Sequence, residues 1–314
     1  MIRLILSRIL TTIPLLFVVT ILAFTMVQLM PGSIAEIILD AGATPEAVAE
    51  LEAQMGLDRP ILVQYFDWFR NALRGDLGTS IFFNSPVSEL IGESWKVTAS
   101  IVLGGMMVGV SLGLILGIIA GLRPGSLLDR MSTIGASIGV SLPAFWLGLL
   151  LAIVLGVQLD LFPVIGYTTF AESPLGWLHS ITLSSLALGI PSAALIARQM
   201  RSSMANVLQS SYIRAQRAMG LGRWQIVAGH ALKNAMIPVI TVIGFRLAVV
   251  LGSAFIVETV FLLPGLGRQM ATAVTNQDVI FVQGGVVVIA AFIIFANMFI
   301  DIIYGFLNPK VRIN

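Results

Sequence analysis

The run Val97–Leu122, VTASIVLGGMMVGVSLGLILGIIAGL, contains no Asp, Glu, Lys or Arg. A helix needs about 20 apolar residues to cross the hydrocarbon core of a bilayer, so this run is long enough to span a membrane. Five other runs meet the same requirement: Ile9–Met30, Met131–Leu159, Pro174–Ala197, Ala235–Val257 and Val279–Ile300. Barrel strands are only about ten residues long and alternate in polarity, so the runs predict an all-α membrane protein with six transmembrane helices.

The composition of the 314-residue chain leads to the same class. Hydrophobic residues make up 57% and charged residues 11%, whereas soluble domains average roughly 45–50% and 25%. So few charges cannot solvate the surface of a water-soluble globule, and the high apolar content excludes a disordered chain. Cysteine is absent, which excludes disulfides, thiolate metal sites and cysteine nucleophiles and leaves the redox compartment open.

The distribution of charge predicts the orientation. Six spans place both ends of the chain on one side of the membrane, and basic residues favour cytoplasmic loops. With the ends inside, twelve of the eighteen Lys and Arg residues are cytoplasmic, and Asp129 is the only clear acid there. Ten of the sixteen acids lie in the outer segment 31–96. We therefore expect an N-in, C-in topology.

The outer segment 31–96 is the one long connection on that side. Thr44 and Pro45 read as the N-cap and first residue of a helix that stops near Gly56. A second helix is expected from Pro60 to Leu73, with its apolar residues on one face. These helices can lie on the membrane or on the outer ends of the spans, and they can also form a lip that contacts a soluble partner.

No motif for covalent chemistry is present. The chain has no Gly-x-x-x-x-Gly-Lys phosphate-binding loop and no His-Glu-x-x-His metal motif. His179 and His230 fall on opposite sides of the membrane in this topology and cannot share a metal ion. We therefore expect no enzyme activity, no metal and no cofactor in this chain, and no nucleic acid as a partner.

The connection 198–237 carries six Arg or Lys residues and no acid. Its centre, residues 210–222 with the sequence SSYIRAQRAMGLG, reads as a short helix capped by serine and ended by Gly220. So short a helix is unstable alone in water, so something must pack on it. The alternative is a basic loop that only sets topology.

This segment resembles the loop of ABC-transporter permease subunits that forms a coupling helix, which seats in a groove of the cytoplasmic ATPase. Ala215, Gly220 and Ile237-Pro238 match, while Arg214 replaces the leading glutamate. That departure resembles the branch that serves peptides and nickel, although Gln216 stands in a small-residue place. The resemblance implies that ATPase coupling involves Tyr212, Arg214, Ala215, Gln216, Arg217, Ala218, Gly220 and Leu221.

Other stretches resemble the same branch, in the same order, from the first span to the last residues. They are Met30-Pro31-Gly32, 56–60, Gln64-Tyr65, 74–78, 258–261, 264–268, Gln283-Gly284, Asp301, Tyr304, Pro309 and Arg312. The resemblance implies a type I ABC importer permease fold in a prokaryotic inner membrane. Its expected segments are 1–30 with the first span, the extracytoplasmic 31–96, a five-helix core 97–305 and a cytoplasmic tail 306–314.

The resemblance also implies partners. They are a second, homologous permease subunit, two cytoplasmic ATPase subunits that hold ATP and Mg²⁺, an extracytoplasmic binding protein and membrane lipid. The expected cargo is short peptides, or small solutes such as nickel complexes or glutathione. Two other classes stay open: a stand-alone secondary transporter, which would need an inverted repeat and coupling residues, and a non-transporting scaffold.

Two features lie inside the predicted spans. Small residues at four-residue spacing let helices approach closely in lipid, either within this chain or toward a second permease; the row consists of Gly105, Gly109, Gly113, Gly117 and Gly121.

Arg246 is the one charge well inside a span, where it is costly unless it faces a cavity or a partner. Our hypothesis is that Arg246 lines the translocation path and contacts a substrate carboxylate, and the alternative is a buried structural pair.

Overall fold

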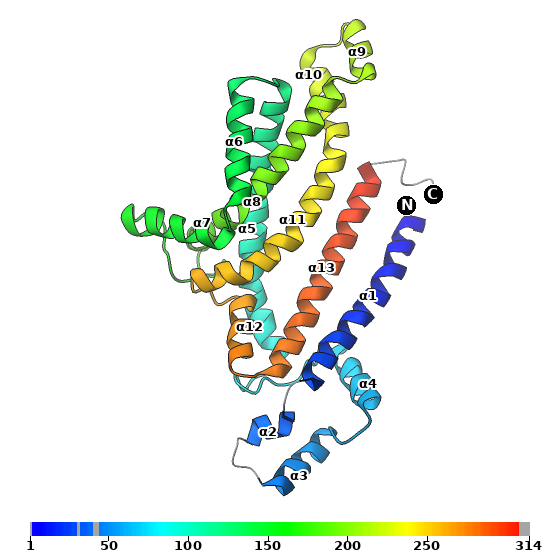
Figure 1. The fold of residues 1–314 in the computed structure, drawn as a ribbon, viewed down its shortest axis with the longest axis vertical. Helices are drawn as coiled ribbons and strands as arrows, with labels where there is room; N and C mark the ends of the chain where they lie inside the picture. The colour runs from blue at the N-terminus through cyan, green and yellow to red at the C-terminus, as the bar shows by residue number, and fades with distance from the viewer. Residues whose placement is uncertain (1, 30–31, 40–43, 308–314) are drawn as a thin grey trace.

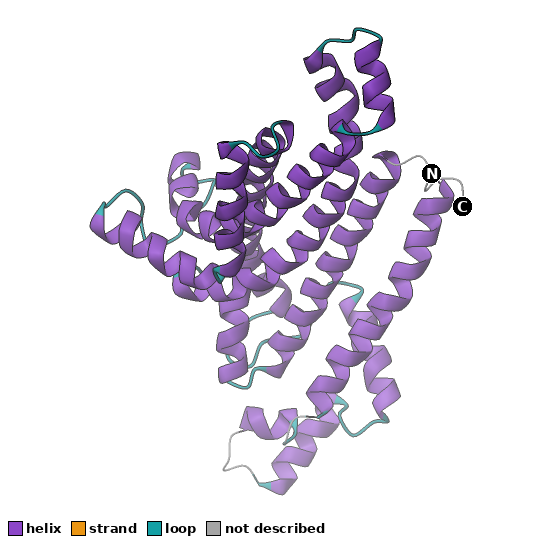
Figure 2. Cartoon of the chain, turned by 45° about the horizontal axis from the view of Figure 1, so that its top comes forward, coloured by secondary structure: helices purple, strands orange, loops and turns teal. Residues whose placement is uncertain are grey.

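A computed structural model describes residues 2–29, 32–39 and 44–307. The described residues fold as helices joined by turns and by two longer connections, 73–86 and 159–173, the first of which contains an isolated bridge between Thr79 and Pro86 (Figures 1 and 2). In chain order the helices are α1 (Ile2–Gln28), α2 (Ile34–Leu39), α3 (Pro45–Met55), α4 (Ile61–Ala72), α5 (Val87–Leu122), α6 (Leu127–Ser141), α7 (Ala144–Leu151), the π-helical η1 (Ala152–Gln158), α8 (Pro174–Leu208), α9 (Ser211–Ala218), α10 (Arg223–Ile226), the π-helical η2 (Val227–Ala231), α11 (Leu232–Val260), α12 (Leu266–Thr275) and α13 (Val279–Leu307).

Five helical stretches within the described ranges are long and apolar enough to cross a membrane, as predicted for the first, second, fourth, fifth and sixth spans. The third predicted run, Met131–Leu159, is not one straight helix. That run divides into α6 and the α7–η1 helix, which meet at a bend of 103°. The break falls at Pro143, the N-cap of α7, because proline has no backbone N–H to continue the preceding helix.

The bent pair still accounts for one crossing. Along the contact between α5 and α8, the residue numbers of both helices increase in the same direction. Gly105 faces Leu188 at one end of the contact, and Gly121 faces Met204 at the other, so the two helices run parallel. The chain between two parallel helices must return once, and α6 with α7 and η1 is that return. Counted in this way, the described residues contain six crossings.

The first and last long helices pack side by side (Figure 1). An ion pair between Arg8 of α1 and Asp301 of α13, 3.0 Å apart, joins them near the beginning of one and the end of the other. The two helices therefore run antiparallel, as an even number of crossings requires. The expected motif residues Met30, Pro31, Pro309 and Arg312, and positions 308–314 of the expected tail, lie outside the described residues.

The segment after α1 contains the two predicted helices. In α3, the Thr44 hydroxyl accepts a hydrogen bond from Ala47 N, Pro45 occupies the first position, and Gly56 stops the helix with φ +70°. The second predicted helix is α4, which packs on α1 through a buried hydrogen bond of 2.9 Å between Tyr65 Oη and Thr20 Oγ1. Both predictions are confirmed.

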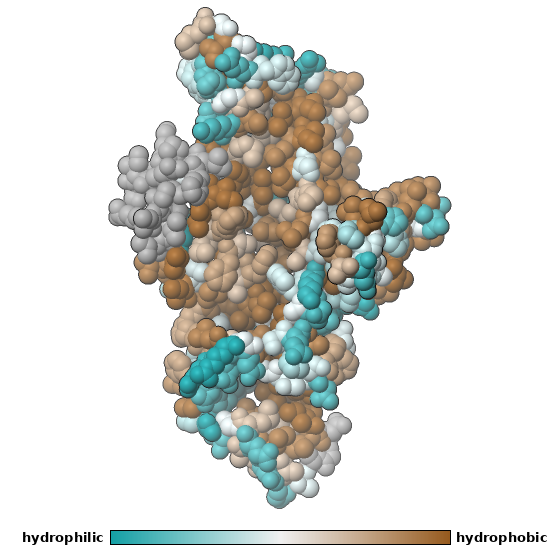
Figure 3. Space-filling view, turned by 180° about the vertical axis from the view of Figure 1, so that it is seen from behind, coloured by the Kyte–Doolittle hydropathy of each residue, from teal (hydrophilic) through white to brown (hydrophobic). Residues whose placement is uncertain are grey.

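A broad apolar surface crosses the middle of the molecule between polar patches at the two ends (Figure 3). This is the surface expected of a protein whose middle is surrounded by lipid tails. One end carries α9 and α10, and the opposite end carries α2, α3 and α4 (Figure 1). We call them the α9 end and the α4 end. The N-in, C-in orientation of these two ends stays a prediction.

Candidate functional site

The chain between α8 and α11 projects beyond the rest of the bundle at the α9 end (Figure 1). The expectation that 198–237 is a loop was wrong for most of its length. The α8 helix continues to Leu208, and α10 and η2 lead without a break into α11, so only Gln209–Gly222 lies outside these helices. The projection is helical because its apolar residues form a core of their own; its buried members are Ile196, Met200, Met204, Ile213, Ile226, Val227, Ala231, Ala235 and Val239.

The short helix α9 ends as predicted. Leu221 N donates to Gln216 O at 3.2 Å, and Gly220 has φ +81°, a conformation that costs a residue with a side chain roughly 1–2 kcal/mol. The predicted serine cap was wrong in detail. Ser210 occupies the N-cap position, but its hydroxyl donates to Val207 O at 2.6 Å and accepts nothing from the first turn.

Ile213 fastens α9 to the bundle. Its side chain is fully buried among Met200, Met204 and the residues of α10 and η2. Burial of an isoleucine side chain contributes about 1.5–3 kcal/mol. A second tie is the hydrogen bond of 2.9 Å from Asn234 Nδ2 of α11 to Tyr212 Oη. The bundle is therefore the partner on which this short helix packs.

The other predicted coupling residues lie around the free side of α9. Gln216 and Leu221 are half-buried, and the remaining six are exposed: Tyr212, Arg214, Ala215, Arg217, Ala218 and Gly220. Sequence reasoning missed two large apolar side chains beside them, Met219 at 70% exposure and Trp224 at 73%. Large exposed apolar groups at a polar end mark contact surfaces. The sequence could have indicated this surface, because Met219 and Trp224 are bulky apolar residues within a basic segment.

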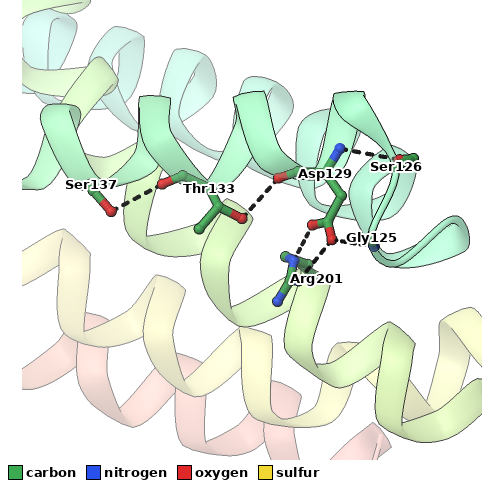
Figure 4. Close-up of polar contacts among 6 residues, drawn as sticks. All are labelled: Gly125, Ser126, Asp129, Thr133, Ser137 and Arg201. Atoms are coloured by element: carbon green, nitrogen blue, oxygen red, sulfur yellow. Dashed lines mark hydrogen bonds and ion pairs between the residues drawn. The ribbon is translucent and has the colours of Figure 1, made fainter.

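An ion pair below the projection joins α6 to α8 (Figure 4). The Asp129 carboxylate is buried and accepts from Arg201 Nη2 at 2.8 Å, from Arg201 Nε and from Gly125 N at 2.8 Å. Ser126 caps α6 by accepting from Asp129 N. Asp129, the one clear acid predicted on the inner segments, therefore holds the turn between α5 and α6 against α8.

The glycine row on α5 faces α8 of the same chain. A Cβ added at Gly113 would lie 2.7 Å from Ile196 Cβ, and one at Gly117 or Gly121 would lie 2.6 Å from Met200 or Met204 Cβ. Gly105 and Gly109 meet α8 in the same way. The two helices are closely apposed along this row, which ties α5 to the helix that carries α9.

Arg246 lies half-buried on α11 and points at α8. Its Nη2 and Nε atoms donate to Ser192 Oγ at 3.1 and 3.3 Å. Ser192 also packs against Gly109 of the glycine row. The ion pairs recorded among the described residues do not include Arg246. The guanidinium therefore has a neutral hydroxyl as its contact in this chain.

A buried carboxylate organises the α4 end of the same bundle. Glu258 accepts from Thr98 Oγ1 at 2.5 Å and from Arg268 N at 3.1 Å, and the Thr98 hydroxyl accepts from Leu266 N. A side chain at Gly265 would collide with this carboxylate. The motif pieces 258–261 and 264–268 thus belong to one connection between α11, α12 and α5, which the sequence alone did not place.

A second buried carboxylate, Asp278, holds the residues before α5 to the start of α13. It accepts from Ser80 Oγ, from Phe82 N at 3.2 Å and from Phe281 N at 3.1 Å. Within the described ranges, no group of three or more His, Cys, Asp or Glu side chains could hold a metal ion.

Comparison with known proteins places this architecture in a family. Residues 113–313 match the family described as "binding-protein-dependent transport system inner membrane component", and residues 1–103 match its N-terminal companion. A putative peptide transport system permease protein of Brucella abortus is 36% identical over 312 residues, covering 99% of each chain. The dipeptide transport system permease protein DppB of Alkalihalophilus pseudofirmus is 34% identical over 325 residues, covering 97% of this chain and 98% of that protein.

The glutathione transport system permease protein GsiC of Salmonella typhimurium is 37% identical over 312 residues, again covering 99% of each chain. Similarity at this level extends through every helix described above, so it concerns the whole chain. The chain belongs to the inner membrane components of binding-protein-dependent transport systems and is a multi-pass membrane protein.

Proposed function

We propose that this chain is a permease subunit of an ATP-driven importer and that α9 is its coupling helix. One observation carries the proposal: α9 is anchored by buried Ile213, while its basic residues and the neighbouring Met219 and Trp224 stay exposed at one end of the molecule. A helix held in this way can transmit force from a protein that docks on it. Membership in a family of transport components supports this reading.

The full machine would contain a second, homologous permease, two ATPase subunits on the α9 end and a binding protein on the α4 end. ATP and Mg²⁺ would bind to the ATPase subunits, outside this chain. The basic charge of 198–237 supports a cytoplasmic α9 end and hence the N-in, C-in orientation.

Motion of α9 would reach the membrane through the helices on either side of it. The α8 helix is tied to α5 along the glycine row and to α6 by Arg201 and Asp129. A displacement of α9 would therefore move α5, α6 and α8 together as one body. Closure of the ATPase pair would open the permease pair outward, and hydrolysis would restore the inward-facing state.

The proposed cargo is short peptides, or small solutes with a carboxylate such as glutathione. Relatives are named for the transport of peptide, dipeptide and glutathione. Arg246 supports this class, because a guanidinium whose hydrogen bonds to the described residues go to one hydroxyl is expected to attract an anion. We propose that Arg246 contacts the substrate carboxylate; a carboxylate of the second permease is the competing partner.

Copurification tests the docking of α9. The double variant Arg214→Glu/Arg217→Glu should lose the ATPase subunits while the permease pair still assembles, because it reverses charge on exposed residues only. Arg123→Glu, an exposed residue at the same end, is the matched control. Unchanged recovery of the ATPase subunits with the double variant would contradict the proposed role of α9.

Uptake of paired substrates tests Arg246. Arg246→Gln should slow uptake of a dipeptide with a free carboxyl end and leave its C-terminally amidated analogue unaffected, since only the first offers an anion. Equal loss for both peptides, together with weaker assembly of the permease pair, would assign Arg246 to a structural contact instead.

A further inference from the structure

A large apolar crevice lies between α1, α4, α5 and α13. Its volume is about 790 Å³, within the roughly 300–1,000 Å³ of small-molecule sites. Among the described residues that line it, polar groups are limited to the hydroxyls of Thr20 and Ser88 and the indole N–H of Trp95. The apolar lining includes Ile13 and Phe17 of α1, Phe69 of α4, Ile91 and Trp95 of α5, and Phe292 of α13.

The crevice has fixed walls. Trp95 and Phe292 pack edge to face with ring centroids 4.7 Å apart, which closes the side between α5 and α13. Phe17 contacts Phe69 at 5.9 Å between centroids, and the hydrogen bond from Tyr65 to Thr20 holds α4 beside α1. On the α5 wall, a Cβ added at Gly92 would meet no atom within 4 Å, so Gly92 borders open space.

The α4 helix places the mouth of the crevice at the edge of the bilayer. Its outward face exposes Ile61, Leu62 and Phe66 at 52%, 68% and 57%. Such an apolar face is stable only where it meets lipid, as in helices that lie in the membrane interface. The crevice runs from this helix along the apolar sides of α1 and α13.

Two basic residues are sequence neighbours of the residues that line the crevice. Arg70 lies one position from the lining residue Phe69, and Arg74 lies between the lining residues Leu73 and Gly75. Both are exposed, and their guanidinium groups make no ion pair with a described residue. Three nearby acids have partners of their own, since Asp67 pairs with Arg59, Glu93 pairs with Lys96 and Asp76 caps Gly78 N.

We propose that this crevice binds one anionic phospholipid from the leaflet on the α4 side. An acyl chain would fill the apolar space beside Gly92, and the phosphate would lie against Arg70 and Arg74. A bilayer lipid is the occupant that combines a long apolar chain with an anion at the interface. The bound lipid would act as packing between α1, α4 and the core, independently of what the protein transports.

Native mass spectrometry of the full-length chain, in the complex in which it purifies, tests the site. Wild type should retain one phosphatidylglycerol per chain through delipidation and prefer it over phosphatidylcholine. Gly92→Leu should weaken this binding at least tenfold, because the new side chain occupies the space of the acyl chain. Gly252→Leu is the matched control: it is also an exposed helical glycine with an open Cβ direction, and it lies away from the crevice.

A headgroup variant separates the two parts of the site. Arg70→Gln/Arg74→Gln should still bind lipid but lose the preference for phosphatidylglycerol. Equal retention of phosphatidylglycerol by wild type and Gly92→Leu would overturn the proposal, and so would a wild type that shows no preference between the two lipids. A dimer of this chain that is lost in Gly92→Leu would also overturn it, because a second copy would then be the occupant.

Discussion

At the residue scale, the close approach of α5 and α8 depends on glycines, which have no side chain to separate the two helices. The glycines of α5 present their backbone to Leu188, Ser192, Ile196, Met200 and Met204. In lipid, helices gain little from the hydrophobic effect, so close packing and small residues decide their association. The glycine row stabilises the association of α5 with α8 because it lets these two long helices contact each other over several turns.

Replacement of one glycine in this row should therefore destabilise the protein. We expect Gly113→Leu to lower stability by about 1–3 kcal/mol, because its Cβ would collide with Ile196 Cβ. Gly135→Leu is a suitable control, since a Cβ there meets no atom within 4 Å. Thermal unfolding of the detergent-solubilised complex measures both, and equal melting temperatures would contradict the close apposition of α5 and α8.

The pair of Asp129 and Arg201 gives a second prediction at this scale. Asp129→Asn should destabilise the junction of α6 and α8 by about 1.5–3 kcal/mol, the range for hydrogen bonds to charged groups. Arg201→Gln should act on the same contact, so the double variant should cost less than the sum of the two single variants. Strictly additive losses of stability would show that the two side chains do not interact.

At the element scale, the sequence predicted helices better than the breaks between them. Thr44, Pro45 and Gly56 bound α3 by local chemistry that is readable along the chain. The apolar run 131–159 was read as one span although it contains Pro143, because hydropathy does not respond to backbone geometry. The contact of Thr20 with Tyr65 joins residues 45 positions apart, and no local pattern reveals such a contact.

The same limit applied to the α9 segment. The glycine stop and the basic residues were readable, whereas the role of Ile213 depends on residues of α8, α10 and η2 that meet only in the fold. The expected loop was helical because distant apolar residues cover one another. Local patterns predicted which residues are free to dock, and tertiary packing determines how α9 is held.

Removal of the Ile213 anchor should loosen α9 as a unit. Ile213→Ala leaves a cavity in a fully buried site, and such changes cost about 2–5 kcal/mol. We expect faster hydrogen exchange over 211–218 and weaker recovery of the ATPase subunits, with the long helices unchanged. Met219→Ala, at a 70% exposed position, is the control for exchange. Unchanged protection of α9 in Ile213→Ala would contradict the anchoring role.

At the scale of the whole molecule, the account depends on which end faces the cytoplasm. The chain has no cysteine, so single-cysteine variants report one position each. Glu50→Cys on α3 should react with a membrane-impermeant maleimide in intact cells, because we expect the α4 end outside. Gln209→Cys beside α9 should react only after the membrane is opened. The reverse pattern would invert the proposed topology.

The central claim is that ATP drives transport through this chain by way of α9. Uptake of a dipeptide into proteoliposomes that contain the chain, its permease partner, the ATPase subunits and the binding protein tests it most directly. The account predicts uptake that requires ATP and the binding protein and that falls at least tenfold with Arg214→Glu/Arg217→Glu. Uptake by this chain alone, driven by an ion gradient without ATP, would contradict it and identify a secondary transporter.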